Sequence, residues 1–302
     1  MNDPHSPSLA AKIAGLIPND GKHSTSIEAL CLLRLSNPTP PTPVVYTPKL
    51  FVVAQGKKNV VAGTEARTCD AFQYLLLTVP LPIHGRIVQA SKDQPFLALN
   101  IGLEMNVIAE VLQQMDAKTP VRHDEKWHAN RGIQANPLDQ DLIDALHRLL
   151  NALANPERAR ILGAMALREI YYLLLSRNEG DMLRAFIQQD RHSFRIARVL
   201  DFIQENLHQT LNVETLADMA NMSPSSFHEH FKTVTDTTPQ QYIKSMRLDQ
   251  ARRRIVEQGL SVSEAAYQVG YASTSQFSRE FKRLFGVSPR DAVAPLGGFT
   301  GL

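Results

Sequence analysis

The chain has 302 residues, of which 43% are hydrophobic and 21% are charged, and its formal net charge is +2 at pH 7. This composition is typical of a globular protein with room for two domains, and it excludes the disordered and fibrous classes. The near-neutral balance is only a weak electrostatic signal for nucleic acid, since residues 191–293 hold 13 Lys and Arg against 11 Asp and Glu.

The cysteine content and the apolar runs bear on the cellular compartment. Cys31 and Cys69 are too few for a disulfide framework and form no CxxC pair. The first 20 residues have no apolar signal-peptide core, and the longest apolar run is short and broken by Pro80 and Pro82. We therefore expect a cytoplasmic protein that does not contact membranes, with a flexible N-terminus over residues 1–23.

Residues 28–101 predict β-structure. Short runs of β-branched and aromatic residues, separated by Gly, Pro, Lys or Asp, lie at 51–55, 59–63, 73–79, 86–90 and 95–101. Their close spacing favours a small barrel or sandwich. The proline-rich stretch 36–48 has strand signals on both sides, so we predict an extended loop within this domain.

The periodicity becomes helical after residue 101. Apolar residues recur at helical spacing over 102–115, 138–153 and 156–175, and the polar stretch 118–137 predicts a loop between the first two helices. The polar segment 176–181 is expected to close the first domain, and an all-helical second domain follows from about residue 192.

The second domain contains an internal repeat. Six residues recur fifty positions later with the same residue type: Ser223, Ser225, Phe227, Phe231, Lys232 and Pro239 return as Ser273, Ser275, Phe277, Phe281, Lys282 and Pro289. A short helix precedes each copy; Asn212 can cap the first, and Ser261 with Glu264 forms a capping box for the second. Helix, short turn and helix is the outline of a DNA-reading unit.

The outward positions of the second helix of each unit carry polar side chains. Since the phenylalanines four apart share a buried face, the positions left outward are Ser225, Ser226, His228 and Glu229 in the first unit and Ser275, Gln276, Ser278 and Arg279 in the second. Arg can bind guanine through two bonds, Gln adenine, and Glu can accept from cytosine. An ordinary solvated face is the alternative for any single helix, but two such faces in tandem favour DNA.

A helix of roughly 17 residues is expected between the units and would span about 25 Å. That length is compatible with reading successive major grooves on one face of a duplex. Its basic residues, Lys244, Arg247, Arg252, Arg253 and Arg254, are expected to be available for phosphates.

With these motifs the chain over residues 195–293 resembles the AraC/XylS family of bacterial transcription regulators. The resemblance rests on LADMANMSPSSFHEHFK, TPQQYIKSMRLDQAR and SVSEAAYQVGYASTSQFSREFKRLFGVSPRDAV. It implies a seven-helix domain whose third and sixth helices enter adjacent grooves of double-stranded DNA, using the outward residues above together with Lys232 and Lys282. Glu229 departs from the resemblance, since many members carry a basic residue there.

Residues 24–180 resemble the sensor domain of the same family through VYTPKLFVVAQGKKNV, QYLLLTVPLPIHGRIVQAS, PFLALNI and REIYYLLL. The resemblance implies a cupin-like half-barrel that binds a small effector and can form a homodimer, and it suggests contact with RNA polymerase. The expected fold is therefore α+β: a cupin-like half-barrel followed by helices over 24–180, then an all-α domain over 192–293 with two helix-turn-helix motifs joined by a linker helix. A flexible tail over 294–302 is expected to end the chain.

The sequence offers several candidate small-molecule sites. Polar, aromatic or thiol residues on or beside the strands are candidate effector contacts: Tyr46, Gln55, Cys69, Tyr74 and His84. Cys31 and Cys69 leave open the sensing of an oxidant or electrophile, although buried structural thiols are the commoner case.

Metal sites and catalysis are not expected. His228 and His230 are about 200° apart around a helix and cannot share an ion, and the loop residues His123, Asp124, Glu125 and His128 fit a solvated loop better than a metal site. A cupin-type metal enzyme would need an H-x-H pair and a Glu, whereas the strand region contains only His84. We predict no catalytic residue, no metal and no cofactor; the second alternative to the regulator is an architectural DNA-binding protein without a sensor.

Overall fold

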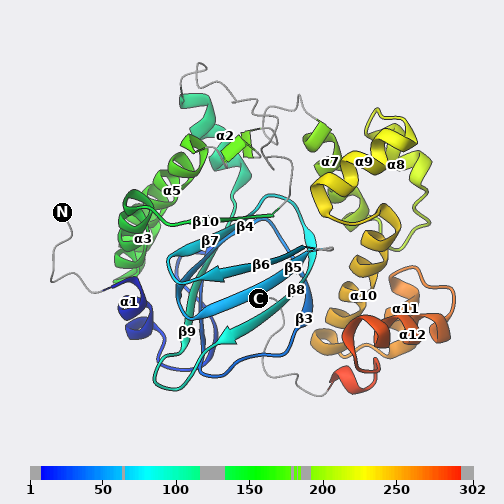
Figure 1. Ribbon diagram of the computed structural model, residues 1–302, viewed down its shortest axis with the longest axis horizontal. Helices are drawn as coiled ribbons and strands as arrows, with labels where there is room; N and C mark the ends of the chain where they lie inside the picture. Colours follow the sequence, from blue (N-terminus) through cyan, green and yellow to red (C-terminus); the bar gives the residue numbers. More distant parts are fainter. Residues whose placement is uncertain are drawn as a thin grey trace.

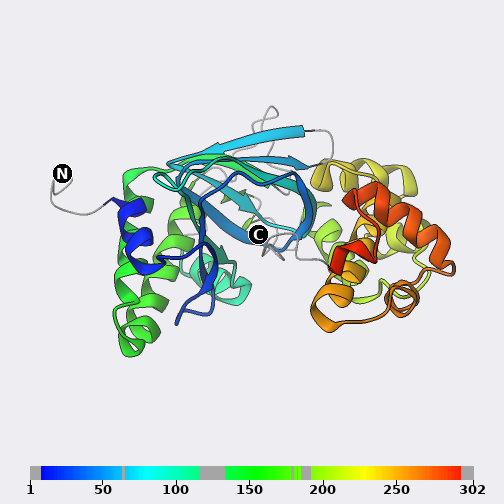
Figure 2. The same ribbon diagram turned by 90° about the horizontal axis from the view of Figure 1, so that it is seen from below.

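The computed structural model describes residues 8–62, 65–115, 133–177, 180–181, 183–184 and 192–293. A helical layer, a pair of facing β-sheets and a C-terminal helical domain lie in a row, in that order, in two perpendicular views (Figures 1 and 2). The N-terminal half is thus β-rich with its own helices, and the C-terminal part is all-α, as the sequence predicts.

Two antiparallel sheets form the half-barrel. The larger has the strand order β1-β2-β9-β4-β7-β10, and the smaller β3-β8-β5-β6. The bounds of the larger sheet are β1 (Gly21–Ser24), β2 (Leu30–Leu35), β9 (Phe96–Gly102), β4 (Lys49–Gln55), β7 (Gln73–Leu77) and β10 (Ile133–Pro137). Those of the smaller are β3 (Thr42–Tyr46), β8 (Leu81–Gln89), β5 (Lys57–Ala62) and β6 (Glu65–Asp70).

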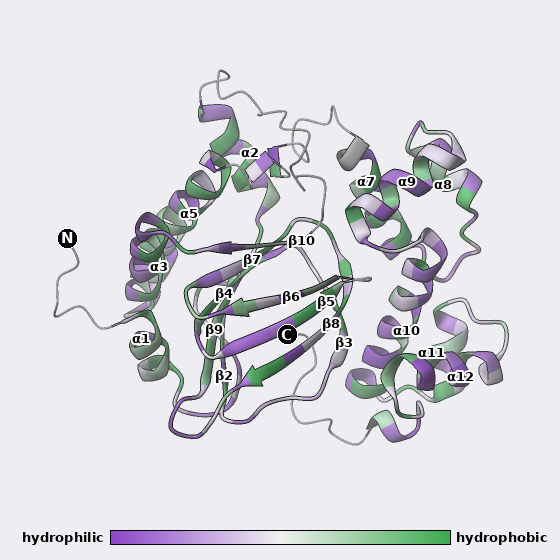
Figure 3. Cartoon of the chain, in the orientation of Figure 1, coloured by the Kyte–Doolittle hydropathy of each residue, from purple (hydrophilic) through white to green (hydrophobic). Residues whose placement is uncertain are grey.

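The larger sheet is buried on both faces, so its central strands are mostly apolar. In β4, Leu50 and Val52 pack against the helices, while Phe51 and Val53 face the smaller sheet. Burial on both faces explains why β4 is a continuous apolar run without alternation. Figure 3 shows the same apolar colouring along parts of β2, β4 and β9.

Five of the predicted strands correspond to β4, β5, β7, β8 and β9. The proline-rich stretch 36–48 differs from the expected loop, because β3 forms within it. Pro43 is tolerated there because β3 is an edge strand, and Pro82 is tolerated in β8 because the pairing of β8 with β5 begins only at Ile83.

The ends of other segments also differ from the sequence prediction. Residues Leu9–Leu16 form helix α1, whose Leu9 and Ile13 are buried, so this part of the expected flexible N-terminus is folded. In the expected loop 118–137, Ile133–Pro137 forms β10 on the edge of the larger sheet beside β7. The candidate metal ligands of that loop, from His123 to His128, and the expected tail 294–302 lie outside the described residues.

The predicted helices of the first domain are present. They are α2 (Met105–Gln114), α3 (Gln140–Ala152), α4 (Pro156–Arg158), the π-helical turn η1 (Ala159–Gly163) and α5 (Ala164–Ser176). With α1 they bury their apolar faces in one cluster on the outer face of the larger sheet. Gly163 allows this helical run to approach Ile27 closely, since a Cβ there would lie 2.7 Å from the Ile27 side chain and would require that side chain to move.

The C-terminal domain consists of α7 (His192–Glu205), α8 (Val213–Met219), α9 (Pro224–Thr235), α10 (Pro239–Gln258), α11 (Val262–Gln268), α12 (Thr274–Phe285) and the short η3 (Asp291–Val293). Helices α8 and α9 repeat as α11 and α12, at offsets of 49 and 50 residues. Hydrophilic and apolar residues alternate along these helices (Figure 3), as expected for helices with one buried face.

The repeat preserves turn and cap chemistry. The Asn212 side chain accepts from Glu214 N and caps α8, and Ser261 and Glu264 form the predicted capping box of α11. Asn221 and Gly270 occupy equivalent turn positions with φ of 50° and 86°, where the left-handed region favours Asn and Gly. Asp236 and Gly286 end α9 and α12 in the same region.

The C-terminal domain is docked on the smaller sheet. Helix α10 faces the half-barrel (Figure 1) and contacts β3 and β8. The Tyr242 hydroxyl donates to Pro80 O at 2.9 Å, Arg253 donates to Val45 O at 3.2 Å, and Arg67 pairs with Asp236 at 3.6 Å. A cavity of about 210 Å³ remains between the outer face of β3 and β8 and helices α10 and α12.

Candidate nucleic-acid interface and sensor site

The helices α9 and α12 present the predicted polar faces. In both, two phenylalanines four residues apart are fully buried, with ring centroids 5.4 Å apart for Phe227 and Phe231 and 5.5 Å for Phe277 and Phe281. The phenylalanines fix the rotation of each helix. The structure leaves these predicted positions exposed: Ser225, His228, Glu229 and Lys232 on α9, and Ser275, Gln276, Arg279 and Lys282 on α12; Ser226 and Ser278 are half-buried.

The linker helix sets the spacing of the two faces. Helix α10 has 20 residues, slightly more than expected, and therefore spans about 30 Å at 1.5 Å per residue. It ends at Gly259 with φ of 67°, as the glycine predicts. This length approaches the roughly 34 Å between successive major-groove segments on one face of a duplex.

The basic residues of α10 are engaged within the protein, which corrects the expectation that they are available for phosphates. Arg252 is buried and pairs with Asp249. Arg247 donates to Leu207 O at 2.9 Å, and Lys244 lies 3.1 Å from a carboxylate oxygen of Glu280. Arg253 donates to Val45 O, and Arg254 bonds Gln268.

Arg279 carries an exposed guanidinium on the outward face of α12. Within the described part of the chain, its side chain forms no hydrogen bond or ion pair, whereas its neighbour Gln276 is held by Glu280 at 3.4 Å. Glu280 also accepts from the Tyr271 hydroxyl at 2.8 Å and from Lys244. Burial alone would raise the pKa of Glu280, but these hydrogen bonds hold it below its ordinary value, so the carboxylate stays charged and orients Gln276.

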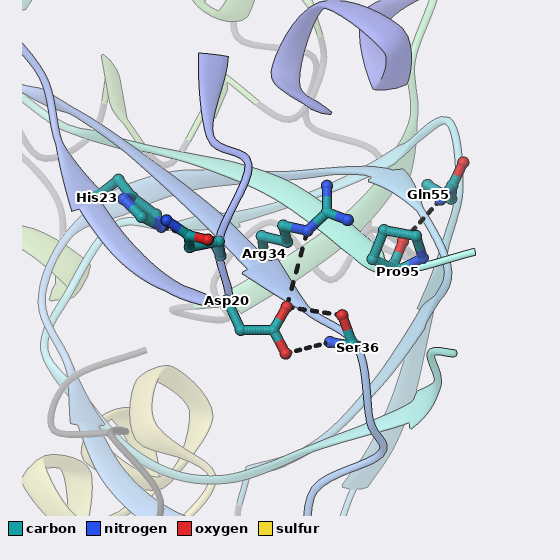
Figure 4. Close-up of polar contacts among 7 residues, drawn as sticks. Asp20, His23, Arg34, Ser36, Gln55 and Pro95 are labelled. Atoms are coloured by element: carbon teal, nitrogen blue, oxygen red, sulfur yellow. Dashed lines mark hydrogen bonds and ion pairs between the residues drawn. The ribbon is translucent and has the colours of Figure 1, made fainter. Parts of the chain in front are cut away.

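The predicted effector contacts do not converge on one pocket. Tyr46 and Cys69 point into the interior between the two sheets, Tyr74 faces the helices on the other side of the larger sheet, and His84 lies on the outer face of β8 beside the interdomain cavity. Gln55 donates its amide to Pro95 O at 2.8 Å, which ties a strand end to a loop (Figure 4). The same view shows Asp20 joined to Ser36 and to Arg34, a second such tie at the start of β1.

The structure instead brings two lysines together with Tyr46 in the interior. Lys58 is fully buried, and its Nζ lies 2.7 Å from the Tyr46 hydroxyl and 4.1 Å from the centroid of the Phe51 ring. Lys49 Nζ lies 4.8 Å from the centroid of the Tyr46 ring. Burial, reinforced by neighbouring positive charges, lowers the pKa of Lys58 to about 7 and that of Lys49 to about 8.

The sequence did not single out these lysines. In KKNVVA both Val60 and Val61 are apolar, so the sequence does not show which face of β5 is buried. Only pairing with β8 and β6 directs Lys58 into the interior.

The two thiols are less suited to reaction than these amines. Burial raises the pKa of Cys69 to about 12 and also raises that of Cys31, so both are protonated near neutral pH.

Two further findings concern membranes and metals. No helix in the described ranges is long and apolar enough to span a membrane. Within the same ranges, no three His, Cys, Asp or Glu side chains are grouped so as to hold a metal ion.

A β-rich domain with its own helices, followed by two helix-turn-helix units on one linker helix, defines a class of bacterial regulators. The family model for the N-terminus of AraC-type transcriptional regulators matches residues 26–182, and a helix-turn-helix domain model matches residues 216–294. The chain belongs to the AraC-type family.

Curated relatives support this assignment over part of their length. The chain is 28% identical over 156 residues to the transcriptional activator RhaS of Escherichia fergusonii, covering 51% of this chain and 55% of RhaS. It is 33% identical over 124 residues to the probable transcriptional regulator LumQ of Photobacterium leiognathi, covering 38% of this chain and 50% of LumQ. The chain thus spans about half the length of these relatives.

The whole fold resembles that of ToxT from Vibrio cholerae. One ToxT structure aligns with a TM-score of 0.62 at 15% identity, covering 90% of this chain and 98% of ToxT. Another ToxT structure, described as bound to an unsaturated fatty acid, gives 0.61 at 14% identity, covering 90% of this chain and 97% of ToxT. At this identity the likeness establishes the fold.

Proposed function

We propose that the protein binds double-stranded DNA at specific sequences and regulates transcription, with α9 and α12 reading adjacent major grooves. The observation that carries this proposal is the pair of exposed polar faces, each fixed by two buried phenylalanines and joined by a rigid helix of about 30 Å. Ser225, Ser226, His228 and Glu229 would read one groove, and Ser275, Gln276, Ser278 and Arg279 the other. Lys232 and Lys282, exposed near the helix ends, would bind phosphates.

The direct test selects binding sites from a random duplex library and compares the selected site with a scrambled one. A specific regulator binds its site about 10³-fold or more tightly than the scrambled duplex at physiological salt. An architectural protein binds both alike, with a steep dependence on salt. Equal affinities for the two duplexes would therefore refute the proposal.

We further propose that residues 24–180 form the sensor domain and residues 192–293 the DNA-binding domain, and that a small-molecule effector of the first controls the second. The docking of α10 on β3 and β8 supplies a route, since a ligand that moves these strands changes the contacts of the linker helix. The fatty acid held by ToxT supports a small organic effector. The direction proposed is activation by contact with RNA polymerase, in line with the name given to RhaS.

A homodimer through the first domain is also proposed. Exposed apolar residues at helical spacing form a stripe along η1 and α5: Ile161, Leu162, Met165 and Tyr172. A second copy of the same stripe is the simplest occupant, because a two-fold dimer buries identical surfaces together. Met165→Glu should then shift the protein from dimer to monomer in sedimentation velocity, with Arg160→Glu, a change at an exposed position of the same run, as the control for added charge. A wild-type monomer at high concentration would exclude the dimer.

A further inference from the structure

Lys58 is an amine whose environment is unusual for lysine. Its side chain is fully buried between the two sheets, and among the described residues no carboxylate pairs with it; its one hydrogen bond is to the Tyr46 hydroxyl. Lysine is almost never buried to this degree unless it is paired with an acid. Apolar and aromatic side chains make up most of this interior, including Phe51, Val60 and Ile87.

A second positive charge strengthens the effect of burial. Lys49 projects into the same interior from β4, its Nζ lies 4.8 Å from the centroid of the Tyr46 ring, and its charge opposes protonation of Lys58. Lys49 in turn is opposed by Lys22 and Arg253. Desolvation together with a neighbouring cation is the combination that makes a lysine amine nucleophilic at neutral pH.

We propose that Lys58 is a covalent receptor for small aldehydes or ketones, which it captures as an imine. The Nζ lone pair attacks the carbonyl carbon, a C–N bond forms, and a proton passes from nitrogen to the former carbonyl oxygen to give a carbinolamine. That hydroxyl then leaves as water together with the remaining proton of the nitrogen, and the C=N bond forms. The net reaction is amine plus carbonyl compound giving imine plus water, without any oxidant or reductant. The Tyr46 hydroxyl, 2.7 Å from Nζ, is placed to pass the proton to the leaving oxygen.

The packing around the amine favours a small ligand. A Cβ on Gly85 would lie 3.1 Å from the Tyr46 hydroxyl and 3.4 Å from Lys58 Cε. The absence of a side chain at Gly85 of β8 therefore leaves the space that Tyr46 and Lys58 occupy. An adduct on Lys58 must displace Tyr46, the last residue of β3. Among the described strands, β3 pairs only with β8, so it can shift at lower cost than a strand paired on both sides.

Displacement of β3 would reach the C-terminal domain directly. The residue before Tyr46 is Val45, whose carbonyl accepts the hydrogen bond from Arg253 of α10. Because successive residues of a strand face opposite sides, the adduct acts on the inner face and α10 is held on the outer one. This inference deepens the proposed function by naming the class of effector, and only its effect on DNA binding depends on that function.

The test treats the full-length protein at pH 7 with limiting propanal and sodium cyanoborohydride, which reduces the imine to a stable amine, followed by peptide mapping. The matched control within the same protein is Lys57, the half-buried neighbour whose amine reaches the surface and pairs with Asp70 at 3.1 Å. Exposed lysines are almost entirely protonated at this pH, so label on Lys58 should exceed label on Lys57 on the order of ten-fold or more. Tyr46→Phe should slow labelling at Lys58 while leaving Lys57 unchanged.

Label spread over exposed lysines with Lys58 unmodified would overturn the proposal. If propionate raised the thermal unfolding temperature of the protein as much as propanal does, the site would be an anion site, and this would overturn the proposal as well. The peptide mapping uses the wild-type protein, so its outcome does not depend on whether a variant folds.

A second experiment measures DNA binding. Propanal should alter the affinity of the wild type for the selected DNA site and should leave that of Lys58→Met unchanged. If the protein binds that site specifically but Lys58 stays unlabelled, only this inference fails; if no specific site is found, the proposed function fails.

Discussion

Arg279 is the residue on which sequence preference of the second unit is expected to depend most. Its exposed guanidinium is free of internal partners in the described part of the chain and can bind a guanine through two bonds. Arg279→Ala should therefore cost about 1–3 kcal/mol on the selected site and relax the preference at one base pair. Lys282→Ala is the matched control: we expect it to weaken all duplexes alike and to reduce the salt dependence. Equal losses on all sequences for Arg279→Ala would mean that it binds only phosphate.

Lys58 predicts a dependence of stability on pH. In the unfolded chain lysine keeps a pKa near 10.4, whereas in the folded protein burial and Lys49 lower the pKa of Lys58 to about 7. Between these values the unfolded state binds more protons, so this group makes the free energy of unfolding rise with pH by at most about 1.4 kcal/mol per pH unit. In the described part of the chain, the other titratable groups facing Lys58 are Tyr46, Lys49 and Cys69.

Lys58→Met should remove this dependence. We expect the variant to be more stable than the wild type, with the largest difference below pH 7 and a shrinking difference as the pH approaches 10. Denaturant unfolding at several pH values measures this difference in stability, and Lys57→Met, at the neighbouring half-buried position, serves as the control. A difference that does not change with pH would show that Lys58 keeps its ordinary pKa in the folded protein.

Among individual residues, the sequence predicts those whose role follows from local chemistry. The caps Asn212 and Ser261, the buried phenylalanine pairs and the exposed positions of α9 and α12 all follow from helical spacing. Lys58 does not, because its burial depends on which face of β5 is covered, and that is set by strands distant in the sequence.

Two glycines of the second helix-turn-helix unit differ in how strictly their positions require glycine. Gly270 and Gly286 both have positive φ, but a Cβ on Gly270 would lie 2.9 Å from Leu207 O, whereas nothing lies within 4 Å of one on Gly286. Gly286→Ala should cost about 1–2 kcal/mol for the left-handed backbone alone. Gly270→Ala should cost more, because α7 and the following turn must also move. Thermal unfolding of both variants measures the difference, and equal losses would show that the contact is relieved without cost.

Among the elements, the helices were easier to predict than the edge strands. Helices α3, α5, α9 and α12 have long periodic apolar faces, whereas β3 and β10 lie in proline-rich or polar stretches and form only because β8 and β7 offer an open edge. Pairing partners of this kind are not visible in a local sequence pattern.

At the scale of the whole molecule, the contact between α10 and the half-barrel is the feature that the sequence did not predict. Asp249 is buried at this contact, pairs with Arg252 and Arg253, and lines the interdomain cavity with His84. Burial raises the pKa of Asp249 in spite of the two arginines, which marks the pairing as enclosed between domains. The basic residues of α10 thus form contacts within the protein, whereas their charge pattern in the sequence suggested that they bind phosphates.

Arg253→Ala should loosen this docking without unfolding either domain. It removes the hydrogen bond to Val45 O, a loss of about 1 kcal/mol that corresponds to about five-fold faster amide exchange in β3. Hydrogen exchange measured by mass spectrometry over residues 42–46 tests it. Arg254→Ala, whose side chain bonds Gln268 within the C-terminal domain, should leave β3 unchanged. Unchanged exchange in Arg253→Ala would mean that docking does not depend on this bond.

The central claim is that α9 and α12 read adjacent major grooves of one duplex. Its most direct test compares site selection by the wild type, His228→Ala and Arg279→Ala, so that each variant reports the base pairs its helix contacts. We predict that each variant relaxes preference at a different segment, and that the two segments lie about 10–10.5 base pairs apart, as the roughly 30 Å span of α10 requires. Loss of preference at the same base pairs in both variants, or at none, would contradict the claim.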